Sequence, residues 1–399
     1  MKNIILLTFL SINSIVLLAQ DNSNSSEELH KKLQEIYDRG YITGFSIAIV
    51  NENDILFEQG YGQSDIKNNQ PYTENTIQNI ASISKTFIGI ALLKAQELGK
   101  LQLDDPINKY LPFEVNNPYY PETPITIRQL TTHTSGITDP KAYEKSGYVL
   151  KNTLNEDMKV NSNFIAPDNL MTYNQFLRNI LSKKGKWYKK KNFNKTEPGA
   201  SFDYSNIGAG LAAYVLEQAT GTPFNEFTKQ YILAPLKMDD SGWFYTNIDS
   251  SLHSKLYTTE GTEVAPYTLI NYPDGGMITS ANNLGKYLQE LIAGYNGNGH
   301  ILTKESFKEL YTTQLSDTHY SNRDDGPYDD EYNMSVFMGF SAENHIGHTG
   351  GDPGVATILF FNKHTNIGKL LIINSDLNNE GVQAFIDIWM TLEAYENKL

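Results

Sequence analysis

Two residues on one predicted helix, Ser82 and Lys85, have the types and the spacing needed for nucleophilic catalysis. The stretch from Asn79 to Lys100 begins with small and polar residues and continues as an apolar run without proline, which predicts a buried helix whose N-terminal end opens onto a cleft. Residues three apart share one face of a helix, so the Lys85 ammonium can reach the Ser82 hydroxyl. A serine hydroxyl needs a neighbouring base to become a nucleophile, and a helix N-terminus favours the negative charge that develops during attack.

A second Ser-x-x-Lys pair occurs at Ser64 and Lys67. It lies in a polar, turn-rich stretch between two extended segments, and no helix follows it that would hold both side chains on one face. We interpret this second pair as a solvated turn. The pattern at Ser82 and Lys85 taken alone also fits a helix cap and a surface lysine, so the catalytic interpretation depends on other segments.

A third candidate is Tyr204, which lies in a Gly/Pro turn before a helix predicted over residues 208–220. A tyrosine held there can lie over a serine and relay its proton, given a nearby ammonium that lowers the tyrosine pKa. The Tyr-x-Asn pattern occurs elsewhere in the chain, but only this copy stands in a tight turn before a helix. A glycine-rich stretch at residues 347–351 precedes a β-rich run, and its glycines allow a substrate backbone to approach closely.

In their order and separations, the motifs Ser-x-x-Lys, Tyr-x-Asn and His-Thr-Gly resemble the serine β-lactamase and penicillin-binding-protein superfamily. The likeness is closest to its branch of class C β-lactamases, DD-peptidases and esterases. Stretches at residues 101–112, 130–137 and 272–284 resemble the same family, and the likeness extends from about Glu28 to Tyr395.

The resemblance implies a role for each motif residue. Ser82 would be acylated, and Lys85 and Tyr204 would share the general-base work. An oxyanion hole would come from the N–H groups of Ser82 and Gly351. The remaining motif residues would bind substrate: Asn206, His348 and Thr349.

One departure from the family pattern lies at His348, where many β-lactamases of this type carry lysine. A neutral imidazole binds a carboxylate less well than an ammonium does, which argues against efficient β-lactam hydrolysis.

The order of predicted elements indicates an α/β (α+β) fold with one mainly antiparallel sheet flanked by helices. β-rich runs occur near both ends of the chain, and helices fill the middle. We expect the sheet to come from about residues 26–115 and 290–399, with an inserted all-helical region over about 116–289. The resemblance implies the same β-lactamase/transpeptidase-like layout, with the site between the sheet and the helical region.

The segment 1–20 has Lys2 and then an apolar run from Ile4 to Ala19 that contains polar residues. This pattern is typical of a secretory signal peptide, and it is short for a transmembrane helix, which needs about 20 apolar residues. We therefore expect residues 21–399 to form one exported domain, periplasmic or secreted, with no integral membrane segment after signal cleavage.

Composition excludes several other functions. The net charge of −14 argues against a nucleic-acid partner, and the absence of cysteine excludes thiol nucleophiles and thiolate metal sites. His345 and His348 would lie on opposite faces of a strand, so we expect no metal, and we expect no cofactor. We interpret the acidic residues between 324 and 331 as a solvated loop and His133 as structural. Seven lysines between residues 183 and 195 form either a solvated loop or a patch for an anionic polymer.

Together these features predict an exported serine hydrolase that acts through a Ser82 acyl-enzyme on a peptide or amide. The expected type is a DD-peptidase or D-amino-acid peptidase, with weak β-lactam hydrolysis as a side activity. The partner would be a small-molecule or peptide substrate, including one derived from peptidoglycan. A carboxylesterase with the same machinery is one alternative, and a non-hydrolytic penicillin-binding sensor is another.

Overall fold

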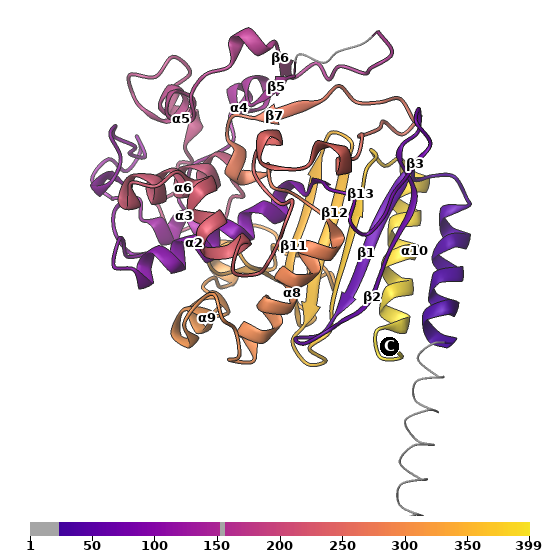
Figure 1. The fold of residues 1–399 in the computed structure, drawn as a ribbon. Helices are drawn as coiled ribbons and strands as arrows, with labels where there is room; N and C mark the ends of the chain where they lie inside the picture. Colours follow the sequence, from indigo (N-terminus) through magenta and orange to yellow (C-terminus); the bar gives the residue numbers. More distant parts are fainter. Residues whose placement is uncertain (1–23, 152–155) are drawn as a thin grey trace, which may run out of the picture.

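The computed structural model describes residues 24–151 and 156–399, and the predicted signal peptide lies outside these ranges (Figure 1). Its centre is an eight-stranded sheet in the order β3-β2-β1-β13-β12-β11-β10-β9, and every neighbouring pair of strands is antiparallel. The strands are β1 (Gly44–Val50), β2 (Ile55–Asp65), β3 (Gln70–Pro71), β9 (Asn333–Met334), β10 (Gly339–Phe340), β11 (His345–Asp352), β12 (Val355–Asn362) and β13 (Gly368–Ile373). The prediction of one antiparallel sheet from both ends of the chain is confirmed.

Helices cover both faces of this sheet (Figure 1). An N-terminal helix over residues 24–37 and α10 pack on one face, and α2 and α8 pack on the other. The strand β1 shows why both faces are covered. Phe45, Ile47 and Ile49 are buried under the N-terminal helix and α10, whereas Ala48 and Val50 are buried on the face covered by α2 and α8. The helices are α2 (Ser84–Glu97), α3 (Ile127–Thr131), α4 (Lys141–Ser146), α5 (Tyr173–Leu181), α6 (Asn206–Thr220), α7 (Phe224–Thr228), α8 (Ala281–Tyr295), α9 (Lys304–Leu310) and α10 (Asn379–Tyr395).

The region between β3 and β9 is mainly helical, but the expectation that its inserted part is all-helical needs one correction. A three-stranded sheet in the order β6-β5-β7 lies within it, made by Phe164–Ile165, Tyr148–Leu150 and Tyr267–Leu269. A two-stranded pair joins β4 (Gln78–Asn79) to β8 (Ile278–Thr279). These strands are too short to give a recognisable period-2 pattern, which is why the sequence does not reveal them.

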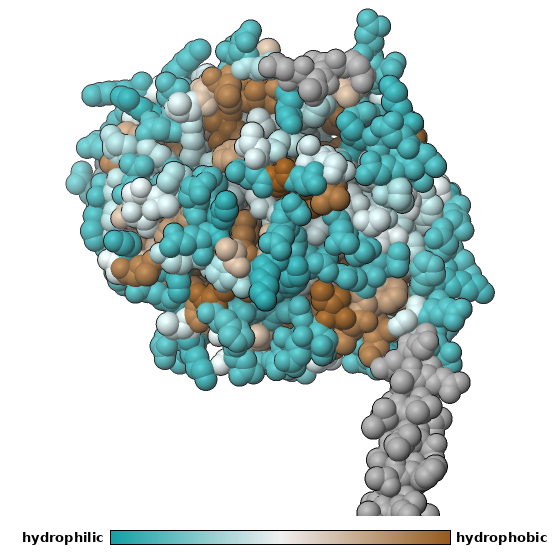
Figure 2. Space-filling model, viewed as in Figure 1, coloured by the Kyte–Doolittle hydropathy of each residue, from teal (hydrophilic) through white to brown (hydrophobic). Residues whose placement is uncertain are grey.

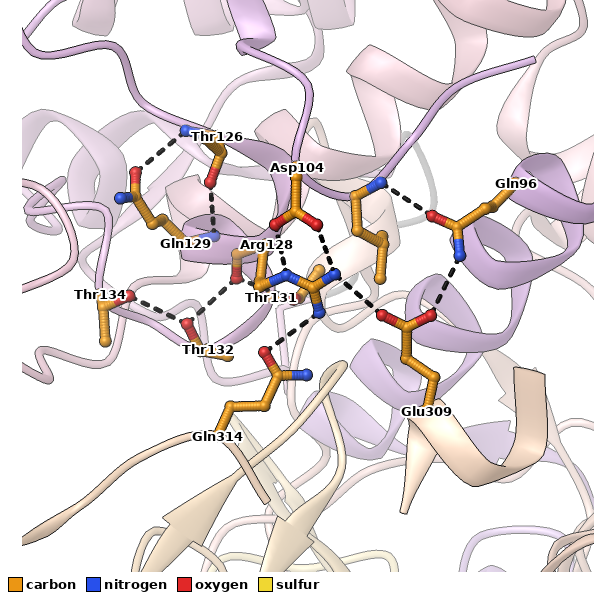
Figure 3. Close-up of polar contacts among 11 residues, drawn as sticks. Gln96, Asp104, Thr126, Arg128, Gln129, Thr131, Thr132, Thr134, Glu309 and Gln314 are labelled. Carbon is orange, nitrogen blue, oxygen red and sulfur yellow. Dashed lines mark hydrogen bonds and ion pairs between the residues drawn. The ribbon is translucent and has the colours of Figure 1, made fainter. Parts of the chain in front are cut away.

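A polar cluster around Arg128 ties α3 to Asp104, to Gln314 and to α9 (Figure 3). The Arg128 guanidinium donates to both carboxylate oxygens of Asp104, at 2.6 and 2.8 Å, and to Gln314 at 3.2 Å. It also pairs with Glu309 on α9 at 2.9 Å. Because a guanidinium presents its donors in a rigid fork, one side chain holds three segments in place. The segment that follows α3 in the chain therefore starts from a fixed position.

The surface of the protein is mainly polar on the face that can be seen. The face in Figure 2 is mainly hydrophilic, with hydrophobic residues in separate small patches. All seven lysines between residues 183 and 195 are exposed. Within residues 24–151 and 156–399, no helix combines the length and the apolar character needed to cross a bilayer.

Candidate active site

Ser82 lies in a short 3₁₀ turn, Ala81–Ile83, that leads directly into α2. Ala81 has a φ of 47°, a left-handed conformation that costs about 1–2 kcal/mol for a residue with a Cβ atom. Lys85 is fully buried, and its Nζ is 2.8 Å from Ser82 Oγ and 2.8 Å from the backbone oxygen of Asp274. The predicted pairing of Ser82 with Lys85 on one helix face is therefore present.

Burial disfavours the charged forms of both Lys85 and Asp274. It lowers the pKa of Lys85, while the Asp274 carboxylate acts in the opposite direction. Burial also raises the pKa of Asp274 to about 7. The neutral amine of Lys85, which can accept a proton from Ser82, is thus more accessible than that of a solvated lysine.

Tyr204 lies beside this pair, with the Lys85 Nζ 5.0 Å from its ring centroid. Burial raises the pKa of Tyr204 well above its usual value, and a hydrogen bond with Ser82 lowers it only in part. The direction is opposite to the lowered Tyr204 pKa that a nearby ammonium was expected to give, because burial is the largest cause of the shift. A protonated phenol at this place can donate a hydrogen bond or pass a proton on, but it is a poor resting-state base.

His133 is buried behind Tyr204, and the two ring centroids are 4.4 Å apart. Its Nδ1 accepts the backbone N–H of Ser205 at 3.1 Å, so its proton lies on Nε2. Burial lowers the pKa of His133 well below its usual value. These contacts agree with the structural interpretation of His133 and add a definite role, because its ring fixes the Tyr204 segment.

Asn206 is oriented by Asp139, a residue that the sequence did not single out. The Asn206 Nδ2 donates to Asp139 Oδ2 at 2.8 Å, and the same carboxylate accepts the backbone N–H groups of Asn206 and Ile207 at 2.9 and 3.0 Å. Since a carboxylate accepts and does not donate, Asn206 Oδ1 must be the atom left to accept a hydrogen bond from a substrate N–H.

The His-Thr-Gly motif lies on β11, which runs beside the Ser82 turn. The Asp330 carboxylate, itself buried, accepts the backbone N–H of Thr349 at 2.6 Å and its hydroxyl at 3.1 Å. The same Asp330 oxygen is 3.1 Å from His348 Nδ1. Burial is the largest cause that lowers the pKa of His348, and Asp330 opposes it.

These contacts change one expectation and narrow another. Asp330 is not part of a solvated loop, because its buried carboxylate holds Thr349 on β11. His348 Nδ1 lies 2.6 Å from the Thr349 backbone oxygen and 3.1 Å from Asp330, so Nε2 is the ring nitrogen left for a substrate. Substrate binding by His348 and Thr349 stays a prediction.

The glycines after the motif leave room at Ser82. A Cβ atom on Gly350 would lie 2.7 Å from the Ile80 oxygen and 3.0 Å from the Ser82 nitrogen, so only glycine lets β11 come this close. A Cβ atom on Gly351 would meet nothing within 4 Å. Ser82 and Gly351 both border one cavity, so their N–H groups remain the candidates for the predicted oxyanion hole.

This active-site cavity has a volume of about 250 Å³ and is lined by Ser82, Tyr143, Tyr148, Tyr204, Asn206, Leu269, Asp274, Gly275, Gly351 and Asp352. It brings together the predicted Ser82, Tyr204, Asn206 and Gly351, whereas His348 and Thr349 do not line it. The sequence analysis did not identify four of the lining residues: Tyr143, Tyr148, Asp274 and Asp352. Asp274 and Asp352 had a signal, because each stands next to a glycine in a stretch that resembles the family.

Ser64 and Lys67 form no comparable site. The Ser64 hydroxyl is buried and donates to the backbone oxygens of Gln70 and Pro71, at 3.3 and 3.0 Å, inside the β2–β3 turn. Lys67 is exposed, so the predicted turn is present but only the lysine is solvated. In the described ranges, no group of three or more His, Asp or Glu side chains is placed to hold a metal ion.

Comparison with known proteins defines the class. The β-lactamase family pattern matches residues 29–387, and the chain therefore belongs to the β-lactamase family of serine hydrolases. It is 25% identical over 370 residues to protein Flp of Staphylococcus aureus, covering 92% of this chain and 66% of Flp. The chain thus spans slightly less than two thirds of that relative.

Two solved structures share the fold. The D-amino acid amidase of Ochrobactrum anthropi SV3 superposes with a TM-score of 0.68 at 22% identity, covering 93% of this chain and 99% of the amidase. A β-lactamase/D-alanine carboxypeptidase of Yersinia pestis gives a TM-score of 0.69 at 18% identity, with coverage of 93% and 98%. The predicted fold and family are confirmed.

Proposed function

We propose that this protein hydrolyses an amide or peptide bond through an acyl-enzyme on Ser82. The observation that carries the proposal is the 2.8 Å contact between Ser82 Oγ and a buried Lys85 at the mouth of a cavity that Gly351 also borders. A nucleophile, a base and backbone N–H donors then converge on one carbonyl-sized space.

The chemistry would proceed in two halves. Ser82 Oγ attacks the substrate carbonyl carbon while Lys85 takes the hydroxyl proton, and the N–H groups of Ser82 and Gly351 stabilise the oxyanion. The C–N bond then breaks as the oxyanion collapses, and the proton that Lys85 took passes through Tyr204 to the leaving amine, which returns Lys85 to its neutral form. Water attacks the acyl-enzyme with the same base, which releases the carboxylic acid and restores Ser82.

The substrate class rests on similarity and on the site. Two structural neighbours are named as a D-amino acid amidase and a β-lactamase/D-alanine carboxypeptidase, so a D-amino acid amide or a peptidoglycan-derived peptide is the proposed substrate. Burial lowers the pKa of His348, and a neutral imidazole binds a substrate carboxylate less well than an ammonium does, which argues against efficient β-lactam hydrolysis. An ester could follow the same steps.

The test is a substrate panel combined with covalent labelling. Purified protein is offered D-alanyl amides and peptides, nitrocefin and short acyl esters, and intact mass is measured after a fluorophosphonate. We expect one adduct, absent in Ser82→Ala, and faster turnover of an amide than of nitrocefin. Absence of any adduct, or an adduct that persists in Ser82→Ala, would overturn the assignment. An enzyme that is acylated but never turns over would instead be a penicillin-binding sensor.

Export is a separate part of the proposal. The apolar run from Ile4 to Ala19 is the supporting feature, and the expected location is the periplasm or the extracellular space. Cell fractionation with N-terminal sequencing of the product tests it: a mature chain starting near residue 21 supports export, and an intact Met1 terminus in the cytoplasm contradicts it.

A further inference from the structure

One wall of the active-site cavity is built from hydrogen-bond acceptors. Asp352 follows Gly351 on β11, and its Oδ1 accepts the Tyr148 hydroxyl at 2.5 Å. On the adjoining wall, the Asp274 carboxylate accepts the Tyr143 hydroxyl at 2.5 Å. Each tyrosine gives its only proton to a carboxylate, so its oxygen can only accept from anything placed in the cavity.

Asn206 adds a further acceptor to the cavity lining. Asn206 Oδ1 is the free end of an amide whose Nδ2 is held by Asp139 at 2.8 Å. The cavity lining includes two aspartates but no arginine, lysine or histidine. Lys85, which contacts Ser82 of this lining, is fully buried and bonded to Ser82 and to the Asp274 backbone. A ligand with several N–H donors and a positive charge would match a cavity of this composition.

We propose that Asp352 binds a free ammonium on the acyl part of the substrate, so that the enzyme prefers an unblocked amino acid amide or an N-terminal residue over an N-acylated one. The proposal rests on the proposed hydrolase function and names its substrate class more closely. The ammonium would donate to Asp352 and to Asn206 Oδ1, while the carbonyl carbon next to it faces Ser82. Three N–H donors of an ammonium suit a wall of acceptors, whereas an acetamide offers one donor and brings a carbonyl oxygen that would meet Asp352.

Asp352 also has a simpler possible role, because its charge acts on Lys85. If it only balanced that lysine, its loss would alter the turnover of every substrate alike. If it binds the ammonium, its loss would affect only substrates with a free amine. Burial raises the pKa of Asp352 to about 6, so the carboxylate is charged at pH 7.5, where the two roles can be compared.

The experiment compares alanine p-nitroanilide with its N-acetyl derivative, both as D and L enantiomers, at pH 7.5. We expect wild type to prefer the free amine and Asp352→Asn to lower the ratio of the two kcat/KM values by about 10- to 100-fold, the loss expected when a charge-assisted hydrogen bond becomes a neutral one. Asparagine keeps the shape and can still accept from Tyr148, so the variant should fold. The matched control is Glu331→Gln, which removes another carboxylate that acts on Lys85 but does not line the cavity, and which should leave the ratio unchanged.

A second measurement needs no turnover. Reversible inhibition by 1-aminoethylboronic acid and by its N-acetyl derivative reports binding at Ser82, and Asp352→Asn should weaken only the former. Equal effects of Asp352→Asn on both members of either pair, or a wild type that prefers the acetylated one, would overturn the ammonium site. Failure of both boronic acids to bind an enzyme whose Ser82 reacts with a fluorophosphonate overturns it as well. Failure of Ser82 to react with any of these probes would instead refute the hydrolase proposal itself.

Discussion

Removal of the Asp330 carboxylate should destabilise the protein far more than its place in an acidic loop indicates. Asp330 Oδ2 accepts the Thr349 backbone N–H at 2.6 Å and the Thr349 hydroxyl at 3.1 Å, and it lies 3.1 Å from His348 Nδ1. Hydrogen bonds to a charged group contribute about 1.5–3 kcal/mol each, and Asp330→Ala removes this acceptor from both the Thr349 backbone N–H and the Thr349 hydroxyl. The hydroxyl can turn toward water, so the expected loss is about 2–4 kcal/mol rather than the full sum.

Urea denaturation of a matched series measures this loss. Asp330→Asn keeps a neutral acceptor and should lose about half as much free energy of unfolding as Asp330→Ala. The exposed neighbour Asp325 supplies the control, and Asp325→Ala should stay within about 0.5 kcal/mol of wild type. If Asp330→Ala behaves like Asp325→Ala, the carboxylate does not hold β11 in solution and the account of the His348 contacts is wrong.

Three further predictions concern the catalytic groups. Ser64→Ala should leave fluorophosphonate labelling of Ser82 unchanged, because the Ser64 hydroxyl is occupied by two backbone oxygens; loss of labelling in a folded Ser64→Ala protein would contradict this. Lys85→Ala and Tyr204→Phe should each lower kcat by about 10²–10⁴-fold with little change in KM, and an effect confined to KM in steady-state kinetics would remove them from the proton transfers. Acylation should speed up as pH rises through the pKa of Lys85, since the neutral amine is the base. The Asp274 carboxylate raises that pKa, so Asp274→Asn should move the rise to lower pH, and a pH-rate profile that is unmoved or shifted upward would rule out this coupling.

Much of the fold is predictable because local signals agree with the tertiary structure. The helix α5 (Tyr173–Leu181) has such a local signal, because its start is marked by a capping box in which Thr172 and Gln175 bond each other's backbone. The hairpin of β1 and β2 follows from two β-rich runs joined by a short polar turn, Asn51–Asp54.

The site is predictable only where a motif carries it. Ser82, Lys85 and Tyr204 are found from local patterns, whereas the partners that position them come from distant parts of the chain. Asp330 shows the reason: it sits among charged residues, a composition that usually means a solvated loop, yet it contacts Thr349 on another strand. The raised pKa of Tyr204 was missed for a similar reason, since burial is a property of the whole fold.

The pairing of the first strand with the last has a consequence for how the protein is made. β1 finds its neighbour β13 only after residues 368–373 have left the ribosome, and until then the β1–β2 hairpin exposes an unpaired edge. The cavity also needs a late segment of the chain, because Ser82 is synthesised long before Gly351, which borders the same cavity. A nascent chain therefore contains Ser82 before it contains Gly351, so the cavity that both residues border is complete only once β11 has joined the sheet.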